Sequence, residues 1–307
     1  ILFSWQQDAQ ALYHTRRQPP FRAALALTAM KFTEQLRRRS EAVDSMLCVG
    51  LDPDVNRFPA CVKEKPDALY EFCRAIVDAT APYVCAFKPQ IAYFASAGEE
   101  DALIRLIDYI HANHPDIPVI LDAKRGDIGS TAKHYAREAF ERFKADALTL
   151  SPYMGGDTIE PYFAYPEKGL FLLCRTSNPG GADIEELVTK DGLMVFEHVA
   201  KAAQGPWNKT GELGLVAGAT QPDEIRRIRV QAPTLPLLMP GIGAQGGDVN
   251  AAVAAGLAAD GWGMVINSSR AVLYAGNDEH FTDAAAAAAQ KTRDAIREAK
   301  KLALAAR

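Results

Sequence analysis

Apolar runs of strand length alternate along this chain with longer stretches whose apolar residues recur at helical spacing. The runs lie at 46–52, 83–89, 117–124, 146–152, 169–177, 212–220, 235–243 and 263–269. Segments between them, such as 67–80 and 132–145, have the pattern of amphipathic helices. Nearly continuous apolar strands that each lead into a helix are typical of a parallel sheet buried on both faces, so the pattern predicts an α/β fold.

The number of strand and helix units narrows the fold further. Eight units follow one another between residues 46 and 269, which matches a (β/α)8 TIM barrel, for which about 250 residues are typical. A doubly wound open sheet would produce a similar pattern and is the alternative. We therefore expect a single-domain TIM barrel over residues 30–307.

The two ends of the chain differ from this pattern. Residues 1–29 contain "RRQPP" and precede Met30, after which "KFTEQLRRRSE" predicts an amphipathic opening helix. We expect 1–29 to be a weakly ordered or upstream extension and Met30 to be the natural start. A secretory signal is the competing interpretation, but "AALALTA" is very short for its apolar region. The alanine-rich segment 283–307 predicts a terminal helix.

Charge and cysteine usage restrict the partners and the compartment. The chain has 34 Lys and Arg against 38 Asp and Glu, a net charge of −4, with no run of five like charges, so nucleic-acid binding is not favoured. No apolar stretch approaches the ~20 residues of a membrane span. Five cysteines without a C-x-x-C pair, three of them inside apolar runs, indicate reduced core residues of a cytoplasmic protein.

Polar residues gather at one kind of position, at or just past the C-terminal ends of the apolar runs. They are Asp52, Lys88, Asp122, Lys124, Ser177, Gly241 and Arg270. In a TIM barrel these ends form the catalytic face. An isolated Asp there is more often a loop cap or a solvated charge, but that explanation does not fit seven such residues on one rim.

The stretch "LDAKRGDIGSTAKHYA" brings opposite charges together after the third run. Strand alternation predicts Asp122 and Lys124 on the same face, with Ala123 toward the helices. Asp127 follows Gly126 beyond the strand and can approach Lys124 from another direction. Two carboxylates beside one ammonium keep the lysine protonated and the carboxylates ionised, so Lys124 is suited to act as an acid.

A phosphate site is predicted after the last two strands. "PGIGAQGGD" follows the seventh run and is rich in glycine, so its backbone N–H groups can approach an anion. "INSSR" follows the eighth run and ends in Arg270, a bidentate phosphate partner. Loops after strands seven and eight commonly hold phosphate in TIM barrels.

These motifs together resemble those of the orotidine 5′-phosphate decarboxylase family. "DAKRGDIGST", from Asp122 to Thr131, matches the family pattern D-x-K-x-x-D-I-x-x-T and is similar to the version in its longer bacterial branch. The resemblance extends over about residues 30–275, in register with the eight predicted strands. It implies cofactor-independent decarboxylation of orotidine 5′-phosphate to uridine 5′-phosphate in pyrimidine biosynthesis.

The resemblance also implies a role for each matching residue. Lys124 would protonate C6 of the pyrimidine as carbon dioxide leaves, and Asp122 would lie against the substrate carboxylate. The further implied catalytic residues are Lys88, which completes the charge network, and Asp127. The implied substrate-binding residues are Asp52 for the ribose hydroxyls, Ser177 for the pyrimidine amide edge, Gln245 and Arg270 for the phosphate, and Thr131 and Ser269.

Homodimerisation is implied too, with Asp127 and Thr131 contributed to the site of the second subunit. The chain departs from shorter family members in the long connection 178–212 after the fifth strand. This segment is expected to include the loop that closes over the substrate.

Two alternatives remain at this point. A sugar-phosphate decarboxylase or aldolase of the same barrel group would share the D-x-K-x-x-D signature but use Mg²⁺. A non-catalytic barrel that binds a phosphate ligand is the other, because a fold and a phosphate site alone do not prove chemistry. We expect neither a metal nor a cofactor, since His111 and His114 have no nearby set of carboxylates to complete a site.

Overall fold

The computed structural model describes residues 30–218, 221–241 and 248–307. Its sheet has eight parallel strands in the order β2-β1-β8-β7-β6-β5-β4-β3. The strands are β1 Leu47–Leu51, β2 Ala86–Pro89, β3 Ile120–Arg125, β4 Ala147–Leu150, β5 Gly169–Arg175, β6 Leu213–Ala217, β7 Leu237–Pro240 and β8 Met264–Ser268. Each lies within one of the eight predicted runs, except that β3 extends one residue past its run, to Arg125.

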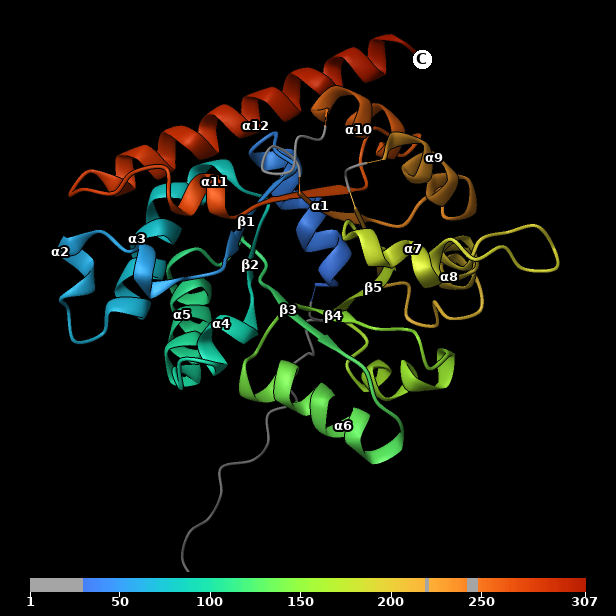
Figure 1. Ribbon diagram of the computed structural model, residues 1–307, viewed down its shortest axis with the longest axis horizontal. Coiled ribbons are helices and arrows are strands. Elements are labelled where there is room, and N and C mark those ends of the chain that lie inside the picture. The colour runs from blue at the N-terminus through green and yellow to red at the C-terminus, as the bar shows by residue number, and fades with distance from the viewer. Residues whose placement is uncertain (1–29, 219–220, 242–247) are drawn as a thin grey trace, which may run out of the picture.

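The two edge strands of this sheet meet and close the barrel. Isolated parallel bridges join Phe87 to Val119 and Gln90 to Asp122, and the Phe87 amide donates to the Pro118 carbonyl at 3.1 Å. β2 and β3 therefore lie side by side, and the ring of strands is visible in Figure 1. The TIM-barrel prediction is confirmed, and the open doubly wound sheet is wrong.

Helices surround the ring, one or more after each strand (Figure 1). The α-helices are α1 Phe32–Ala42, α2 Ala60–Lys63, α3 Ala68–Thr80, α4 Ile91–Ala95, α5 Glu100–Asn113, α6 Gly129–Arg137, α7 Ala182–Glu185, α8 Val195–Gln204, α9 Pro222–Gln231, α10 Val249–Gly256, α11 Arg270–Leu273 and α12 Phe281–Ala305. The helix predicted over 132–145 is shorter than expected, because α6 passes into a π-helical turn over Glu138–Arg142.

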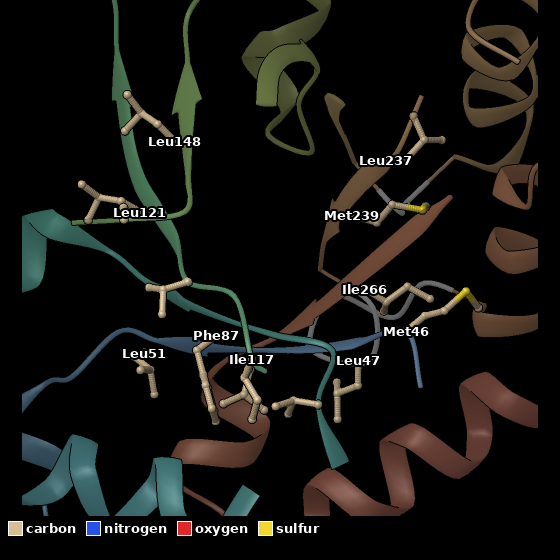
Figure 2. Close-up of a cluster of buried hydrophobic side chains, with 14 of the residues drawn as sticks. Met46, Leu47, Leu51, Phe87, Ile117, Leu121, Leu148, Leu237, Met239 and Ile266 are labelled. Atoms are coloured by element: carbon tan, nitrogen blue, oxygen red, sulfur yellow. The ribbon is translucent and has the colours of Figure 1, made fainter. Parts of the chain in front are cut away.

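Alternation along the strands separates two apolar layers. One cluster joins the strands to the surrounding helices, and Figure 2 shows part of it, including Leu47, Phe87 and Leu148. The other fills the barrel interior with the residues between them, such as Cys48, Ala86 and Ala147. Successive side chains of a strand point to opposite faces. In each strand, the inward position two residues after the interior cluster therefore lies closer to the C-terminal end of the barrel, which we call the mouth.

The predicted opening helix closes the other end of the barrel. Phe32 and Leu36 of α1 belong to the interior cluster, and the Phe32 ring meets that of Phe171 edge to face at 5.8 Å. A Cβ on Gly169 would lie 2.2 Å from the Phe32 ring. Glycine at the start of β5 therefore lets α1 seal the N-terminal end, which leaves the mouth as the open end.

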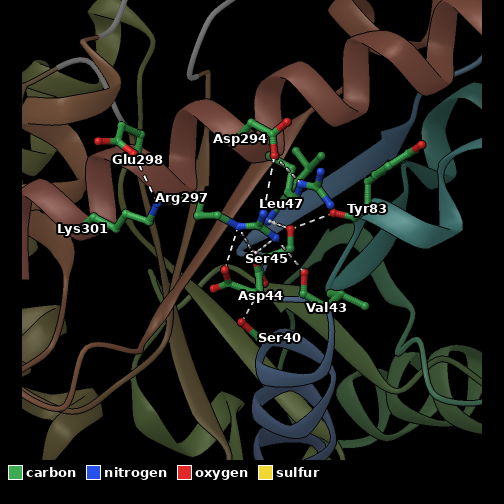
Figure 3. A network of polar contacts seen from close by, with 11 residues as sticks. Ser40, Val43, Asp44, Ser45, Leu47, Tyr83, Asp294, Arg297, Glu298 and Lys301 are labelled. Carbon is green, nitrogen blue, oxygen red and sulfur yellow. Dashed lines mark hydrogen bonds and ion pairs between the residues drawn. The ribbon is translucent and has the colours of Figure 1, made fainter.

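The long C-terminal helix α12 is tied to the turn between α1 and β1 (Figure 3). Arg297 forms an ion pair with the Asp44 carboxylate at 2.7 Å, and it donates to the carbonyls of Val43 and Asp44 at 3.3 and 3.1 Å. In the described parts of the chain, no helix is long and apolar enough to cross a membrane.

Candidate active site

The inward positions just above the interior cluster are polar. Lys88 follows Ala86 in β2, Asp122 follows Ile120 in β3, Thr149 follows Ala147 in β4, and Asn267 follows Val265 in β8, each two residues later. All four are buried. Because a strand repeats its facing every two residues, these side chains form a polar layer in the mouth of the barrel.

Asp122 is the centre of this layer. Its Oδ2 accepts a hydrogen bond from Lys88 Nζ at 2.9 Å, and its Oδ1 accepts one from Lys124 Nζ at 2.7 Å. Lys88 Nζ also lies 4.0 Å from Asp52 Oδ1. The structure therefore brings these four residues together as an alternating chain of two carboxylates and two ammoniums.

The electrostatics keep this chain charged. Burial raises the pKa of Asp122, but the neighbouring Lys88 and Lys124 outweigh it and hold that pKa well below its usual range. For Lys88, burial lowers the pKa, but Asp122 and Asp52 outweigh it and hold the pKa above its ordinary value. Lys124 differs from Lys88 in exposure, since 46% of its side chain is accessible against 5%.

The backbone at Lys124 is irregular. Its φ is +45°, a left-handed value that non-glycine residues rarely adopt. Between Leu121 and Arg125 the register of β3 against β4 shifts, as in a β-bulge. The side chains of Asp122 and Lys124 do lie on the same side, as predicted. The reason given for it was wrong, because Lys124 is placed there by the bulge and not by the regular alternation of a strand.

Thr149 of β4 holds this bulge in place. Its hydroxyl accepts the amide N–H groups of Ala123 and Lys124 at 3.0 and 2.9 Å and donates to Asp122 Oδ1 at 2.9 Å. One side chain therefore fixes both the backbone of Lys124 and the carboxylate that Lys124 contacts. Ala123 packs toward the outer cluster, as predicted.

Asp52 lies just past the end of β1, and one of its carboxylate oxygens accepts no hydrogen bond from the residues that the structure describes. Its Oδ1 is buried and makes no hydrogen bond within the described chain. Its backbone is fixed by Tyr274 after α11, whose hydroxyl donates to the Asp52 carbonyl at 3.1 Å and accepts from the Asp54 amide at 2.6 Å. The free carboxylate oxygen can accept a hydrogen bond from a ligand in the mouth.

Asp127 and Thr131 do not join the charge chain within one subunit. Asp127 Oδ1 accepts from the amide of its neighbour Ile128 at 2.7 Å, and among the described residues it makes no ion pair with Lys124. Thr131 is exposed in the first turn of α6. A single chain therefore brings together Lys88, Asp122 and Lys124 but leaves Asp127 apart.

Of the residues predicted to bind the phosphate, Arg270 lies within the described part of the chain and Gln245 does not. Arg270 is exposed at the first position of α11, and Ser269 precedes it. The Ser269 hydroxyl accepts from Asn267 Nδ2 at 3.1 Å and would lie 2.0 Å from a Cβ on Gly50. Glycine in β1 therefore lets Ser269 lie close over that strand. Gln245 lies outside the described residues.

Ser177 is half-buried just past β5, where its backbone packs against the end of β6. A Cβ on Gly218 would lie 3.1 Å from the Ser177 amide nitrogen. The connection that follows contains α7, a bridge between Val188 and Met194, and α8.

Sequence reasoning missed four polar residues near the mouth: Thr149, Arg175, Asn267 and Tyr274. A signal existed for Thr149 and Asn267, because each is a polar residue near the C-terminal end of its run, two positions after a residue that proves to face inward. Asn267 Oδ1 is buried and makes no hydrogen bond to the described residues. No local signal marks Tyr274, because its contacts lie 220 and 222 positions away.

The described residues include no group of three or more His, Cys, Asp or Glu side chains that could hold a metal ion. His111 contacts Asp146 at 2.9 Å, and His114 contacts Asp78 at 3.1 Å. Each histidine therefore has one carboxylate partner and lies on α5 or just after it.

Comparison with known structures agrees with this fold. The chain is similar to a Leishmania donovani OMP decarboxylase, with 41% identity, a TM-score of 0.77 and coverage of 89% of this chain and 99% of that one. A putative orotidine-monophosphate decarboxylase from Toxoplasma gondii is 36% identical, with a TM-score of 0.80 and coverage of 88% and 97%.

Sequence comparison agrees as well. Proteins named orotidine 5′-phosphate decarboxylase from Azoarcus sp. and Paracidovorax citrulli are each 61% identical, over 267 and 274 residues. These matches cover 87% and 88% of this chain and 98% and 100% of those proteins. The model of the Orotidine 5′-phosphate decarboxylase / HUMPS family matches residues 45–285. On the strength of these matches and the barrel that carries the charged mouth, this chain belongs to the orotidine 5′-phosphate decarboxylase / HUMPS family.

Proposed function

We propose that this chain decarboxylates orotidine 5′-phosphate to uridine 5′-phosphate, a step of pyrimidine biosynthesis, without a cofactor. The observation that carries the proposal is the alternating chain of Lys88, Asp122 and Lys124 in the mouth of the barrel. Two relatives that are named orotidine 5′-phosphate decarboxylase are 61% identical to this chain, and the match covers nearly their whole length.

The chemistry follows from the charge of Lys124. The bond between C6 of the pyrimidine and its carboxyl carbon breaks, carbon dioxide leaves, and the electron pair stays at C6. A fixed ammonium beside C6 stabilises the developing negative charge and then supplies the proton that completes the product. Asp122 holds that ammonium at 2.7 Å, and the pKa of Asp122, held low by the two lysines, keeps the carboxylate charged.

The other predicted residues would bind the rest of the nucleotide. Asp52 has a buried oxygen, 4.0 Å from Lys88 Nζ, that makes no hydrogen bond within the described residues, which suits a donor such as a ribose hydroxyl. Ser177 would read the pyrimidine amide edge, and Gln245, Ser269 and Arg270 would hold the phosphate. Binding energy from the phosphate can then contribute to the chemical step.

We also propose a homodimer in which Asp127 and Thr131 act in the partner's site. Gly126 lies close to Ser151, since a Cβ on it would be 3.2 Å from that residue, so the loops after β3 and β4 are adjacent. These loops expose Ile128, Tyr153 and Met154 by 60%, 79% and 45%. Apolar side chains grouped in this way favour an interface, and a second copy would bring its own Asp127 to the mouth.

A reducing compartment, the cytoplasm, suits the cysteines. Cys48, Cys85 and Cys174 are buried and free, and burial raises the pKa of each thiol. Protonated buried thiols are unreactive.

An assay without added cofactor, after treatment with a chelator, tests the activity. Orotidine 5′-phosphate should lose its absorbance at an unchanged rate, and uridine 5′-phosphate should form in equal amount. A rate that the chelator abolishes and Mg²⁺ restores would favour the sugar-phosphate alternative. Binding of orotidine 5′-phosphate with no turnover would favour a non-catalytic barrel.

A further inference from the structure

Arg175, at the last position of β5, is surrounded by three carboxylates. It is buried with 8% exposed, and it donates to Glu185 at 3.0 Å, Glu186 at 2.5 Å and Glu224 at 3.0 Å. Burial lowers the pKa of Arg175, but Glu224 and Glu185 outweigh it and raise that pKa above its ordinary value. Two of these carboxylates lie in the connection after β5 and the third in α9, so Arg175 joins two loops of the mouth.

Glu185 does more than neutralise Arg175. Its Oε2 also accepts the amide N–H of Thr176 at 2.9 Å, and its Oε1 accepts the Thr176 hydroxyl at 2.7 Å. Arg175 itself donates to the Thr176 carbonyl at 2.7 Å. That carbonyl belongs to the peptide group that carries the Ser177 amide, so the two side chains fix the backbone on both sides of Thr176.

The "NPGG" motif makes room for these contacts. A Cβ on Gly181 would lie 2.8 Å from Glu185 Oε2, 2.8 Å from Thr176 Oγ1 and 2.9 Å from Arg175 Nη1. The φ of Gly181 is −57°, an ordinary value, so the glycine is required for space. The chain turns back over Asn178–Gly181 and brings Glu185 of α7 to the end of β5.

We propose that Glu185, with Arg175, is a positioning residue that sets Ser177 against the pyrimidine edge of the substrate. This inference rests on the proposed function, because it takes Ser177 to read the base. On the other side, Gly218 packs against the Ser177 backbone, since a Cβ on Gly218 would lie 3.1 Å from the Ser177 amide nitrogen, and the Gly218 amide fixes the end of β5 by donating to the Arg175 carbonyl at 2.7 Å. A residue fixed from both sides can discriminate between ligands that differ by one hydrogen bond.

The test compares Glu185→Gln with the matched variant Glu186→Gln. Each removes one charge next to Arg175, but only Glu185 also accepts from Thr176, through both of its oxygens. A glutamine keeps one acceptor oxygen, so the Thr176 amide and hydroxyl cannot both donate to it as they do to the carboxylate. Glu186 is more exposed, 36% of its side chain against 19%. The measurements are kcat and KM, inhibition by uridine and cytidine 5′-monophosphates, and the melting temperature.

We expect Glu185→Gln to lower kcat/KM about tenfold to a hundredfold, because small displacements of binding groups are costly. It should also reduce the preference for the uridine over the cytidine nucleotide, whose ring edges differ in donors and acceptors. Glu186→Gln should stay within about twofold of the wild type, as expected for a more exposed charge. If Glu185→Gln does not fold, Thr176→Val removes one of its contacts and should give a smaller loss of the same kind.

A double-mutant cycle with Ser177→Ala makes the test specific. In the Ser177→Ala background, Glu185→Gln should lower kcat/KM by less than about twofold further, because the effects of residues that act through one group are not additive. Multiplicative losses, or equal losses in Glu185→Gln and Glu186→Gln, would overturn the inference and leave the decarboxylation proposal intact. Full activity and unchanged nucleotide preference in Ser177→Ala would overturn the inference too. The decarboxylation proposal would stand in that case, because the turnover assay with orotidine 5′-phosphate tests it separately.

Discussion

Asp122 is the residue on which the others in the mouth depend. It is buried between two ammoniums, Lys88 at 2.9 Å and Lys124 at 2.7 Å. Removing one partner from a buried charge pair leaves the other charge uncompensated, which is strongly destabilising. Because the Lys124 side chain is exposed, we expect its truncation to affect catalysis more than stability. The Lys88 side chain is buried, so its truncation should destabilise the fold.

Lys124→Ala should lower kcat by several orders of magnitude while the protein stays folded. Losing a fixed group that stabilises the transition state costs at least ~3 kcal/mol, and here the proton donor is lost as well. Steady-state kinetics and circular dichroism check this, with the exposed Lys63→Ala as control. A folded variant with nearly normal turnover would contradict the role of Lys124.

Arg270→Ala tests the phosphate site at the first position of α11. It should lower kcat/KM strongly for orotidine 5′-phosphate but barely change the slow reaction of orotidine, which lacks the phosphate. Measuring both substrates with wild type and variant separates the two effects. Equal losses on both would instead indicate a structural role for Arg270.

At the scale of single elements, strand β3 carries the least regular backbone of the site. The register shift after Leu121 and the left-handed φ of Lys124 cost free energy, and such strain persists only where the surroundings enforce it. Thr149 of the neighbouring strand supplies three hydrogen bonds to this region. The strand that carries the proton donor is therefore shaped by the strand beside it.

Thr149→Val keeps the shape of the side chain and removes these hydrogen bonds. Two part-buried amides, those of Ala123 and Lys124, lose their acceptor, so the free energy of unfolding should fall by ~1–3 kcal/mol. Lys124 should also move, which lowers kcat by at least about tenfold. Urea unfolding and steady-state kinetics measure the two effects.

Thr80→Val is the matched control, because Thr80 is equally buried and bonds only within α3, to the Ile76 carbonyl. It should lose ~1 kcal/mol of stability and keep kcat. A Thr149→Val variant that loses stability but keeps kcat would show that the bulge does not position Lys124.

At the scale of the whole molecule, one chain builds a barrel whose mouth lacks two predicted members, Asp127 and Thr131. Asp127 lies past Gly126 in a loop, next to exposed apolar side chains of the loops after β3 and β4. A second copy across a two-fold axis would cover those side chains, and in an isologous dimer it would receive the same contribution in return.

Mixing two inactive variants tests this arrangement. Lys124→Ala and Asp127→Ala subunits, unfolded together and refolded, should regain about a quarter of the wild-type activity per subunit, because about half the dimers are mixed and each has one intact site. Size-exclusion chromatography and differently tagged subunits verify the mixed dimers. Verified mixed dimers that show only the summed residual rates would place Asp127 in its own subunit's site.

Local patterns in the sequence were sufficient for the architecture. Eight nearly continuous apolar runs, separated by segments of helical period, predicted all eight strands, because a parallel strand buried on both faces must be apolar along its length. Lys88 and Asp122 were placed in the mouth because each stands at the C-terminal end of its run, and in a TIM barrel these ends form the catalytic face. For the opening helix α1, the sequence predicted its amphipathic face but not that it closes the barrel.

The detailed geometry of the site depended on the tertiary structure. The backbone of Lys124 is set by Thr149, 25 positions later in the sequence, and the end of β5 is held by Glu185 from the connection that follows it. Hydrogen bonds between segments far apart in the chain leave no periodic signal, because each partner alone is compatible with many structures. The sequence by itself therefore determined the eight strands and placed Lys88, Asp122 and Lys124 at the mouth, whereas only the folded barrel decided which other side chains join them and the contacts and backbone strain that orient them.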